Sequence, residues 1–481
     1  MSMSNQFSIL LLAAIISYGS IHSADGREFF LRTSEDVNDA INQARPGDTI
    51  VLADGTWRDA DVLFHATGTA EAPITLRAQT PGKVVFAGHS RVRLAGKHLI
   101  VSGLLFRDAW HESALIEFRK DSKQAANDCR VTDCAIIERN PPHPQRSMKH
   151  ISLYGRRNRV DHCHLEGKQT EGATLVVWLA DGAAEHRIDH VFFGPRPRLG
   201  KNGGETIRVG DSTTSLIDAK VLVERNYFQE CNGEVEIISN KSCGNTYRNN
   251  TFLRCEGALT LRHGNRCLVE GNYFLGQGAR YTGGVRIVGE DHRIINNYFG
   301  DLRGKEPRAA LSMMNGIPNT PLHGYRQVTR ATVAFNTFAN CKWSLAIGLG
   351  DRKAILPPRN CLIANNLFLP AGSHFLDEQN RPESFQWKGN LIQMPAPPSD
   401  EIGKQVDDLR MRQASDDIWR PLPDSVAVGT AQGEFPQITT DIDGQSRPKA
   451  KDVGCDQVIP SQAATGPLAA HDVGTSWNIY P

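Results

Sequence analysis

The sequence has no excess of either charge and very few long apolar runs, and each absence excludes a common class of protein. Its 481 residues include 54 Lys and Arg against 53 Asp and Glu, and the basic residues form no runs, so nothing favours a nucleic-acid partner. The apolar stretch at residues 7–16 is too short to span a bilayer comfortably, and no other segment is long and apolar enough. We therefore expect no membrane insertion, and no segment indicates a protein partner.

The same apolar stretch has the length of the central part of a signal peptide. Small residues at Gly19, Ser23 and Ala24 fit a cleavage site, although no Lys or Arg precedes the stretch. No cysteine lies near the cleavage site to indicate lipidation. We expect residues 1–24 to be a signal peptide and the protein to be secreted or periplasmic.

Helical patterns are scarce and the Leu-x-x-Leu-x-Leu signature of leucine-rich repeats is missing, yet the chain repeats. An asparagine two residues before a phenylalanine recurs at spacings of 24, 22, 25, 39 and 30 residues, which indicates a solenoid. Short β-like runs separated by Gly, Asn and Asp predict an all-β parallel β-helix, with each Phe stacked inside the coil and each Asn in a turn. The copies are Asn226-Tyr227-Phe228, Asn250-Thr251-Phe252, Asn272-Tyr273-Phe274, Asn297-Tyr298-Phe299, Asn336-Thr337-Phe338 and Asn366-Leu367-Phe368, followed by the degenerate Asn390-Leu391-Ile392.

Both ends of a solenoid must be covered, because an open coil exposes core and sheet edge. Ser34 is the expected N-cap of a short capping helix that ends before Pro46. Toward the C-terminus the repeat gives way to proline-rich and polar stretches. We expect the β-helix at residues 25–395 and an irregular C-terminal cap at residues 396–481 that packs on the last coils. A separate C-terminal domain is the alternative.

Ten cysteines in an exported protein would normally indicate disulfides. Cys231, Cys255 and Cys341 each follow a repeat phenylalanine by three residues, so they occupy equivalent positions and are expected to stack as small buried side chains. Disulfide pairing stays an alternative. Cys129 and Cys134 form no CxxC pair, and no second Cys/His cluster completes a zinc pattern.

Four short segments between residues 202 and 288 combine strand-like alternation with charged residues: NGGETIRVG, NGEVEIISNKS, GALTLRHG and GGVRIVG. Carboxylates on one coil beside guanidiniums on the next are costly unless something occupies that face. In regular strands Val235, Ile237, Leu259, Leu261, Val285 and Ile287 point one way, and Glu234, Glu236, Thr260, Arg262 and Arg286 point the other.

Glu234 and Glu236 present two carboxylates to the same side of a strand, a pattern that suits a hard cation such as calcium. Asn202, which shares its parity with Arg208 on the preceding coil, offers a third and neutral oxygen. The alternative is that the two glutamates only pair with Arg208 and Arg262.

Lys241 follows the acidic strand, and Arg262 lies 21 residues later, about one coil, so the two are expected to be vertical neighbours. Two cations beside a metal favour a neutral lysine near physiological pH, which makes Lys241 a usable general base. The alternative is an ordinary surface lysine in a turn. His263 either orients substrate or closes the turn. Glu205 has the wrong parity for the outward face unless the two glycines before it break the strand.

NGGETIRVG, NGEVEIISNKS and LRHGN resemble the alginate lyase and chondroitinase B group, polysaccharide lyase family six. The resemblance covers most of the chain, including PGDTIVLADGTW near the start and DIDGQSRP with DVGCDQ near the end. It implies a right-handed parallel β-helix that cleaves acidic polysaccharides by β-elimination in a calcium-assisted site. By position it implies calcium ligands at Asn202, Glu234 and Glu236, the base at Lys241, the acid at Arg262, and a substrate groove that includes Glu205, Arg208, His263 and Arg286.

The implied mechanism makes physical sense of these residue types. Removal of the C5 proton of a uronate builds negative charge on its carboxylate, which a bound metal ion stabilises. Lys241 takes the proton while the glycosidic oxygen leaves C4. Because a guanidinium rarely gives up a proton, Arg262 is expected mainly to stabilise charge, with water or another group completing the protonation.

Alginate, a polymer of mannuronate and guluronate, is the expected substrate, and chondroitinase B-like action on dermatan sulfate is the close alternative. Glycoside hydrolysis on the same fold needs a pair or trio of carboxylates and gives no reason for Lys241 beside Arg262. A non-catalytic carbohydrate-binding β-helix is the third class. The loops between residues 300 and 360, with Met313, Met314 and Tyr325, are expected to shape one end of the groove.

Overall fold

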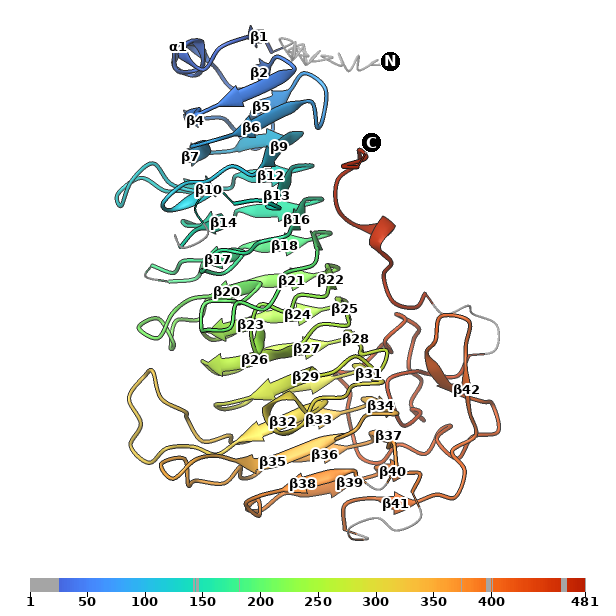
Figure 1. Ribbon diagram of the computed structural model, residues 1–481. Coiled ribbons are helices and arrows are strands. Elements are labelled where there is room, and N and C mark those ends of the chain that lie inside the picture. The colour runs from blue at the N-terminus through green and yellow to red at the C-terminus, as the bar shows by residue number, and fades with distance from the viewer. Residues whose placement is uncertain are drawn as a thin grey trace, which may run out of the picture.

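The computed structural model describes residues 26–141, 143, 147–180, 182–372, 374–394, 399, 401–459 and 465–480. The predicted signal peptide lies outside the described residues. The chain winds into a stack of coils whose strands form three long sheets, and every ladder within these sheets is parallel (Figure 1). The predicted all-β parallel β-helix is confirmed. Of the helices in the described ranges, none has the length and hydropathy needed to cross a bilayer.

In each coil the chain passes through sheet 1, then sheet 2, then sheet 3. Sheet 1 consists of β1 (Glu28–Leu31), β2 (Thr49–Leu52), β5 (Ile74–Ala78), β8 (Leu99–Ser102), β12 (Arg130–Thr132), β15 (Arg159–Asp161), β18 (Arg187–Asp189), β21 (Leu222–Glu224), β24 (Thr246–Arg248), β27 (Leu268–Glu270), β30 (Arg293–Ile295), β33 (Thr332–Ala334), β36 (Leu362–Ala364) and β39 (Gln386–Lys388).

Sheet 2 follows sheet 1 across a tight corner. It consists of β3 (Gly55–Arg58), β6 (Val84–Ala87), β9 (Leu104–Arg107), β13 (Ala135–Ile137), β16 (His164–Glu166), β19 (Phe192–Phe193), β22 (Tyr227–Gln229), β25 (Thr251–Leu253), β28 (Tyr273–Leu275), β31 (Tyr298–Gly300), β34 (Thr337–Ala339), β37 (Leu367–Leu369), β40 (Leu391–Ile392) and β41 (Lys404–Gln405).

Sheet 3 carries the charged segments singled out in the sequence. It consists of β4 (Asp61–Thr67), β7 (Arg91–Lys97), β10 (Ala114–Glu117), β11 (Ala126–Asn127), β14 (Lys149–Leu153), β17 (Leu175–Val177), β20 (Ile207–Val209), β23 (Glu236–Lys241), β26 (Gly257–His263), β29 (Thr282–Ile287), β32 (Leu311–Met314), β35 (Leu345–Leu349) and β38 (Leu376–Glu378).

The repeated asparagines and phenylalanines form two ladders along the stack, as predicted. The Asn250 amide donates to Asn272 Oδ1 at 2.9 Å, and Asn272 donates in the same way to Asn297 at 2.9 Å. This ladder lies at the corner between sheets 1 and 2 and reaches Asn390. The phenylalanine rings stack inside the coil at centroid distances of 4.5 to 5.0 Å, in the order Phe193, Phe228, Phe252, Phe274, Phe299, Phe338 and Phe368.

The cysteines behave as the repeat positions predict. All ten are free and buried in the described part of the chain. The backbone N–H of Cys231 donates to the sulfur of Cys255, one coil on, at 3.4 Å. Burial raises the pKa of Cys267 and Cys341 to about 12, so these thiols are inert packing groups.

The N-terminal end is closed by α1 (Glu35–Gln43), which buries Val37, Ala40 and Ile41 against the first coils. The capping helix is therefore confirmed. Ser34 precedes it, but its side chain makes no capping hydrogen bond. Its backbone is already helical, with φ −70° and ψ −20°, a geometry that differs from that of a usual N-cap.

The C-terminal segment reaches far beyond the last coils on which it was expected to pack. After β41 it forms the antiparallel pair β42 (Met411–Gln413) and β43 (Trp419–Pro421), then runs back along the outside of sheet 2 through η2 (Ala470–Asp472) (Figure 1). The Tyr273 hydroxyl donates to Asp443 at 2.8 Å, and the Trp477 indole donates to the carbonyl of Asp133 at 3.0 Å. The physical reason is that sheet 2 points apolar side chains outward, among them Tyr273, Tyr298, Ala339, Phe192, Tyr227, Leu105 and Ile137, and these need a cover.

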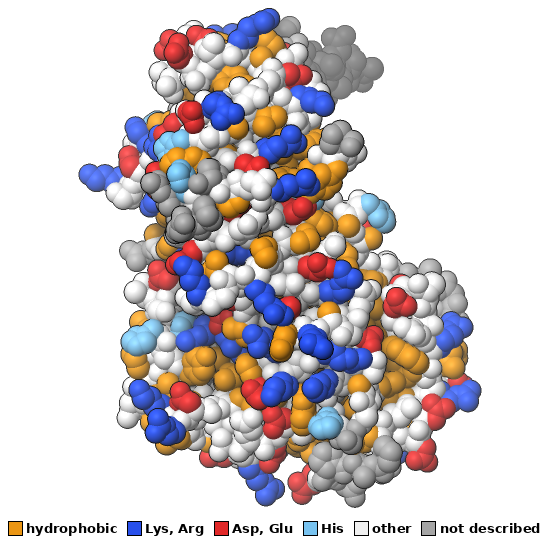
Figure 2. All heavy atoms as spheres, viewed as in Figure 1, with side chains coloured by type: hydrophobic (Ala, Val, Ile, Leu, Met, Phe, Trp, Pro, Cys, Tyr) orange, Lys and Arg blue, Asp and Glu red, His pale blue; other side chains and the backbone are white. Residues whose placement is uncertain are grey.

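Sheet 1 instead covers its outer face with ion pairs that run from coil to coil. Arg130 pairs with Asp161 at 2.5 Å, Arg159 with Asp189 at 2.6 Å, and Arg187 with Glu224 at 2.9 Å. Figure 2 shows Lys and Arg side chains gathered over the middle coils of the face in view, with acidic side chains among them. Arg130, Arg159 and Arg187 of sheet 1 therefore have acidic partners within the fold.

Candidate active site

The candidate residues gather on the outer face of sheet 3, over β20, β23, β26 and β29, and on the turns that enter these strands from sheet 2. In the strand register, Arg208 lies beside Ser239, Ser239 beside Thr260, and Thr260 beside Arg286. The structure therefore brings residues that are up to 78 positions apart in the sequence onto one row.

A β-bulge in β23 changes the predicted parity at the acidic strand. Glu236 pairs with Ala258, whereas Ile238 pairs with the next residue, Leu259, so β23 contains one extra residue. Both Ile237 and Ile238 consequently belong to the core. The prediction that Val235 points inward is wrong: Val235 is half-buried and lines an open cleft beside Glu234.

Two carboxylates, those of Glu205 and Glu236, lie near enough to Glu234 to repel its charge where the chain enters β20 and β23. Burial, followed by repulsion from Glu205 and from Glu236, raises the pKa of Glu234 to about 7. Glu205 is 3% exposed, and its Oε2 has no hydrogen-bond partner among the described residues. Glu205 precedes β20 and lies in the turn, so the strand parity that argued against it does not apply. Clustered and partly unsatisfied carboxylates of this kind are costly without a cation.

The donor set around this cluster fits a hard divalent cation. Asn202 is exposed and lines the same cleft of about 500 Å³ as Glu234. The backbone N–H of Gly203 donates to Glu234 at 3.1 Å and so fixes one of its oxygens. Carboxylate and amide oxygens are the ligands that calcium takes in proteins. Asn202 and Glu234 line one cleft and offer oxygens of this kind, and the carboxylates of Glu205 and Glu236 lie near enough to Glu234 to repel its charge.

Glu236 pairs with one of the two expected arginines, Arg262, and with one that was not expected, Arg286. Its carboxylate pairs with Arg286, two coils' length along sheet 3, while Arg262 Nε lies 3.9 Å away. Arg286 is only 5% exposed. Arg208 does not pair with either glutamate. Its guanidinium lies 4.7 Å above the Trp178 ring.

Lys241 and His263 end their strands side by side, since the two residues are partners in the register of β23 and β26. Burial, followed by the positive charges of Arg262, Lys241 and His323, lowers the pKa of His263 to about 3. His263 is therefore neutral at physiological pH. It can orient a substrate by hydrogen bonding, but it cannot supply a positive charge.

Arg262 is held between the strand face and a long loop. Its guanidinium lies 4.1 Å from the Tyr325 ring centroid, and its Nη1 lies 3.5 Å from His263 Nδ1. Burial lowers the pKa of Arg262, while the Tyr325 and Glu236 charges oppose that shift and Arg286 reinforces it. The direction of this shift makes proton donation less costly than for an exposed arginine.

The loops between residues 300 and 360 line a cleft of about 660 Å³ next to Arg262. Tyr325 and Met314 contribute to its walls, as predicted. Met313 does not. It is fully buried, because it pairs with the inward Ile287 in the register of β29 and β32.

Several neighbouring residues escaped the sequence reasoning. Trp178 and Lys149 flank Arg208, and burial followed by the charge of Arg208 lowers the pKa of Lys149. Strand alternation in the segment LVVW could have indicated Trp178. Val176 is the register partner of Arg208, and Trp178, two residues later, points to the same side. Arg198 pairs with Glu256 at 2.5 Å at the edge of the cleft that Asn202 lines.

Arg196 was also not predicted from the sequence, and it supports the turn that carries Asn202 and Glu205. It is 3% exposed, and its guanidinium donates to the carbonyls of Glu205 at 2.6 Å and of Gly172 at 3.0 Å. A third bond reaches the carbonyl of Gly203 at 3.3 Å. No sequence signal distinguishes this buried arginine from the exposed Arg198 two positions later.

Comparisons with known proteins show the family to which this fold belongs. A family model described as Chondroitinase B matches residues 31–424. The structure of the PL6 family alginate lyase AlyGC is 39% identical over 94% of this chain, with a TM-score of 0.83, and this chain spans 59% of its length. A mannuronic acid specific polysaccharide family 6 lyase from human gut microbiota is 32% identical, with a TM-score of 0.73, over 79% of this chain and 91% of that one.

A family-six polysaccharide lyase from Pseudopedobacter saltans, 23% identical with a TM-score of 0.72, shares the fold over 94% of this chain and 100% of its own. A search of curated proteins found no match. The family model spans most of the chain, and the candidate residues lie on one face of its parallel β-helix. The chain therefore belongs to the chondroitinase B family, polysaccharide lyase family six.

Proposed function

We propose that this protein is a lyase that cleaves alginate by β-elimination, in a site that calcium assists. One observation carries the proposal. The carboxylates around Glu234, the side chain of Lys241 and two arginines, half-buried Arg262 and buried Arg286, meet at one outer face of sheet 3. The likeness to alginate lyases of the same family, at 39% and 32% identity, supports alginate as the substrate.

Calcium would be held by Asn202, Glu234 and Glu236. When bound, it supplies a positive charge for the uronate carboxylate, which becomes more negative as C5 loses its proton. Glu205 adds negative charge beside these ligands, and its unpartnered oxygen is consistent with a role in holding the cation or a water bound to it.

Lys241 is the proposed base that takes the C5 proton. It ends β23, past the acidic strand, next to neutral His263. Arg286 and Arg262 bring two positive charges to the same face, where the anionic sugar must lie. Arg262 meets the charge that develops on the leaving oxygen, and its lowered pKa favours donation of a proton there.

Glycoside hydrolysis is the second candidate, and one observation favours it. A hydrolase needs a protonated carboxylic acid near neutral pH, and the pKa of Glu234 is raised to about 7. Burial and the repulsion from Glu205 and Glu236 account for the same shift, and hydrolysis assigns no role to Lys241. Only elimination leaves a double bond in the product.

Digestion of alginate and of dermatan sulfate distinguishes alginate lyase activity from dermatan sulfate lyase activity and from glycoside hydrolysis. The expected result is ultraviolet-absorbing unsaturated oligosaccharides from alginate, lost on chelation and restored by calcium. Absorbance only from dermatan sulfate would move the proposal to the alternative substrate. Reducing ends without absorbance would favour hydrolysis. Export to the periplasm or medium remains a proposal that fractionation of cells would test.

A further inference from the structure

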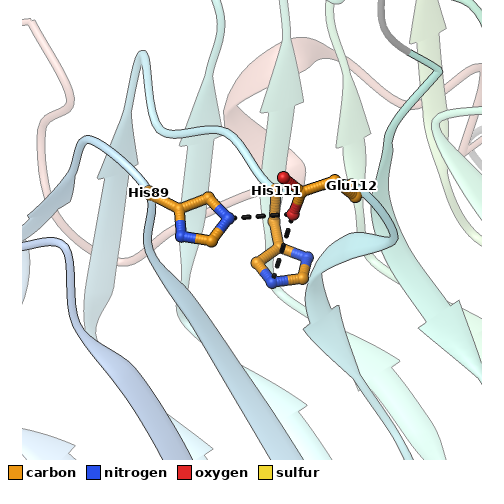
Figure 3. Close-up of side chains that lie close together, drawn as sticks. All are labelled: His89, His111 and Glu112. Atoms are coloured by element: carbon orange, nitrogen blue, oxygen red, sulfur yellow. Dashed lines mark hydrogen bonds and ion pairs between the residues drawn. The ribbon is translucent and has the colours of Figure 1, made fainter.

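Outside the candidate active site, the described residues bring three metal-ligating side chains together at one place. His89 lies in the turn from β6 to β7, and His111 and Glu112 lie in the equivalent turn one coil on, from β9 to β10. Figure 3 shows the carboxylate of Glu112 between the two imidazoles. Their ligand atoms all lie within 4.8 Å of one another.

The distances are close to those of a metal centre. Glu112 Oε2 lies 2.8 Å from His89 Nε2 and 3.7 Å from His111 Nε2. Ligand atoms bound to zinc at about 2.0–2.2 Å in a tetrahedral arrangement are about 3.3 Å apart, which lies between these two values. Small side-chain adjustments would therefore let all three atoms bind one ion.

The imidazoles are held in place by their surroundings. The His89 and His111 rings stack at a centroid distance of 4.7 Å, and Trp110 packs against His89 at 4.5 Å. His111 Nδ1 accepts from the backbone N–H of Ser113 at 3.2 Å and lies 3.2 Å from Ser113 Oγ, and these contacts orient the ring. A metal ion at Nε2 would select the other tautomer, in which Nδ1–H donates to the Ser113 hydroxyl. The side chain of His111 is only 10% exposed.

The cluster is separate from the calcium ligands proposed above. Both lie on turns from sheet 2 into sheet 3, but β10 is three strands from β20 in the order of sheet 3. At the usual strand spacing of about 4.8 Å this is roughly 14 Å along the stack. The nearby cation Arg91 is itself paired with Asp61 at 2.8 Å.

We propose that His89, His111 and Glu112 form a second metal site, which takes zinc or a similar late first-row divalent cation. Two imidazole nitrogens with one carboxylate oxygen suit such a cation, whereas calcium prefers a set made of oxygen ligands alone. Three protein ligands leave a fourth position for water or for an oxygen of a bound molecule. The inference does not depend on the proposed lyase activity.

The chain contains an internal control for this site. His162 and His190 also stack on neighbouring coils, at a centroid distance of 4.8 Å. Each of them, however, pairs with its own buried aspartate, and those aspartates also bind Arg130 and Arg159. His162 is 45% exposed and His89 44%, so loss of either imidazole removes a similar surface group.

Calorimetric titration of the untagged full-length protein with Zn²⁺, in excess Ca²⁺ to fill the oxygen-rich site, tests the proposal. We expect one saturable equivalent in the wild-type protein and in His162→Ala. His89→Ala and His111→Ala should each weaken zinc binding at least about tenfold, since even loss of an outer partner costs that much. Wild-type protein loaded with Co²⁺ should show visible absorption bands that both variants lack.

The absence of saturable zinc binding in the wild-type protein would overturn the proposal. So would equal affinities in the wild type, His89→Ala and His111→Ala, or an equal loss in His162→Ala, since these would place the zinc elsewhere.

Discussion

The outer face of sheet 1 and the turns that enter β20 and β23 of sheet 3 both gather charged side chains, but they arrange them in opposite ways. On sheet 1, arginines and carboxylates alternate, so Asp161 and Asp189 are fully buried side chains with arginine partners. At the start of β20 and β23, by contrast, Glu205 and Glu236 lie near enough to Glu234 to repel its charge. Paired charges satisfy the fold, whereas crowded like charges need a ligand from outside.

The pKa shifts of the two faces express this difference. Burial raises the pKa of Asp189, but hydrogen bonds from Arg159 and His190 outweigh it, so the net pKa is lowered. For Glu234, burial and the neighbouring carboxylates act in the same direction, and the pKa rises to about 7. The following changes test whether sheet 1 is structural and sheet 3 functional.

Lys241→Ala should have the largest effect on activity. Loss of a general base typically costs about 100-fold to 10,000-fold in rate, so we expect at least a 100-fold fall in kcat on alginate, with little change in stability. Release of ultraviolet-absorbing product measures it. Lys404→Ala, an exposed lysine on the last strand of sheet 2, is the matched control and should retain full activity. Wild-type rates in Lys241→Ala would remove Lys241 from the mechanism.

Arg159→Ala should lower the stability of the protein and leave its activity unchanged. It removes the partner of Asp189 and a neighbour of Asp161 at 3.4 Å, and both aspartates are fully buried. We expect a loss of about 1–3 kcal/mol in the free energy of unfolding, measured by denaturant titration, with unchanged kcat in the folded protein. Arg157→Ala, which breaks an exposed pair with Asp128, should cost less. A large fall in kcat for Arg159→Ala would contradict the structural role of sheet 1.

The pH dependence of stability should reveal Glu234 once divalent cations are removed. Its folded pKa of about 7 exceeds the ordinary 4.5, so the folded state keeps a proton that the unfolded chain has released between these values. This contribution is fully present below about pH 4.5 and is lost as the pH rises through 7. Melting temperatures in chelator should therefore fall from about pH 5 to pH 8 more steeply in the wild type than in Glu234→Gln.

Calcium should raise the melting temperature more at the higher pH, because the ionised carboxylate binds it. Parallel pH curves for the wild type and Glu234→Gln would show that crowding at this cluster has no consequence for stability.

Arg208→Lys should have the smallest effect. The lysine keeps the charge but loses the flat stacking on Trp178, so we expect KM for alginate to rise a few-fold, with kcat nearly unchanged. Steady-state kinetics on alginate measure this split. A fall in kcat equal to that of Lys241→Ala would make Arg208 part of the chemistry.

The sequence predicted the repetitive parts of the fold well, because each coil repeats the same local requirement. An asparagine at the corner must bond to the next coil, and a phenylalanine must stack on the next, so Asn272 and Phe274 could be placed from their spacing alone. Predictions failed where the local strand boundaries and register could not be read from the sequence. Val235 precedes β23 and lines the cleft, the extra residue in β23 turns Ile238 inward, and the alternation of β32 buries Met313.

The C-terminal segment shows a second limit of sequence reasoning. Its proline-rich composition indicated an irregular cap, but nothing in it specified where it lies. The segment packs along the stack against apolar residues on the outside of sheet 2, such as Tyr298. The backbone N–H of Trp419 donates to the Tyr298 hydroxyl at 3.1 Å. Contacts between positions over 100 residues apart leave no local pattern.

By itself the sequence determined the coil period, the two ladders and the alternation that places Glu236, Arg262 and Arg286 outward. These follow from local geometry that every coil repeats. Only the tertiary structure decided which charges meet: that Arg286 pairs with Glu236, that Glu205 joins Glu234, and that Arg196 holds their turn. Turns of different length set those distances, because neighbours on adjacent coils are brought together by the winding of the chain and not by their order along it.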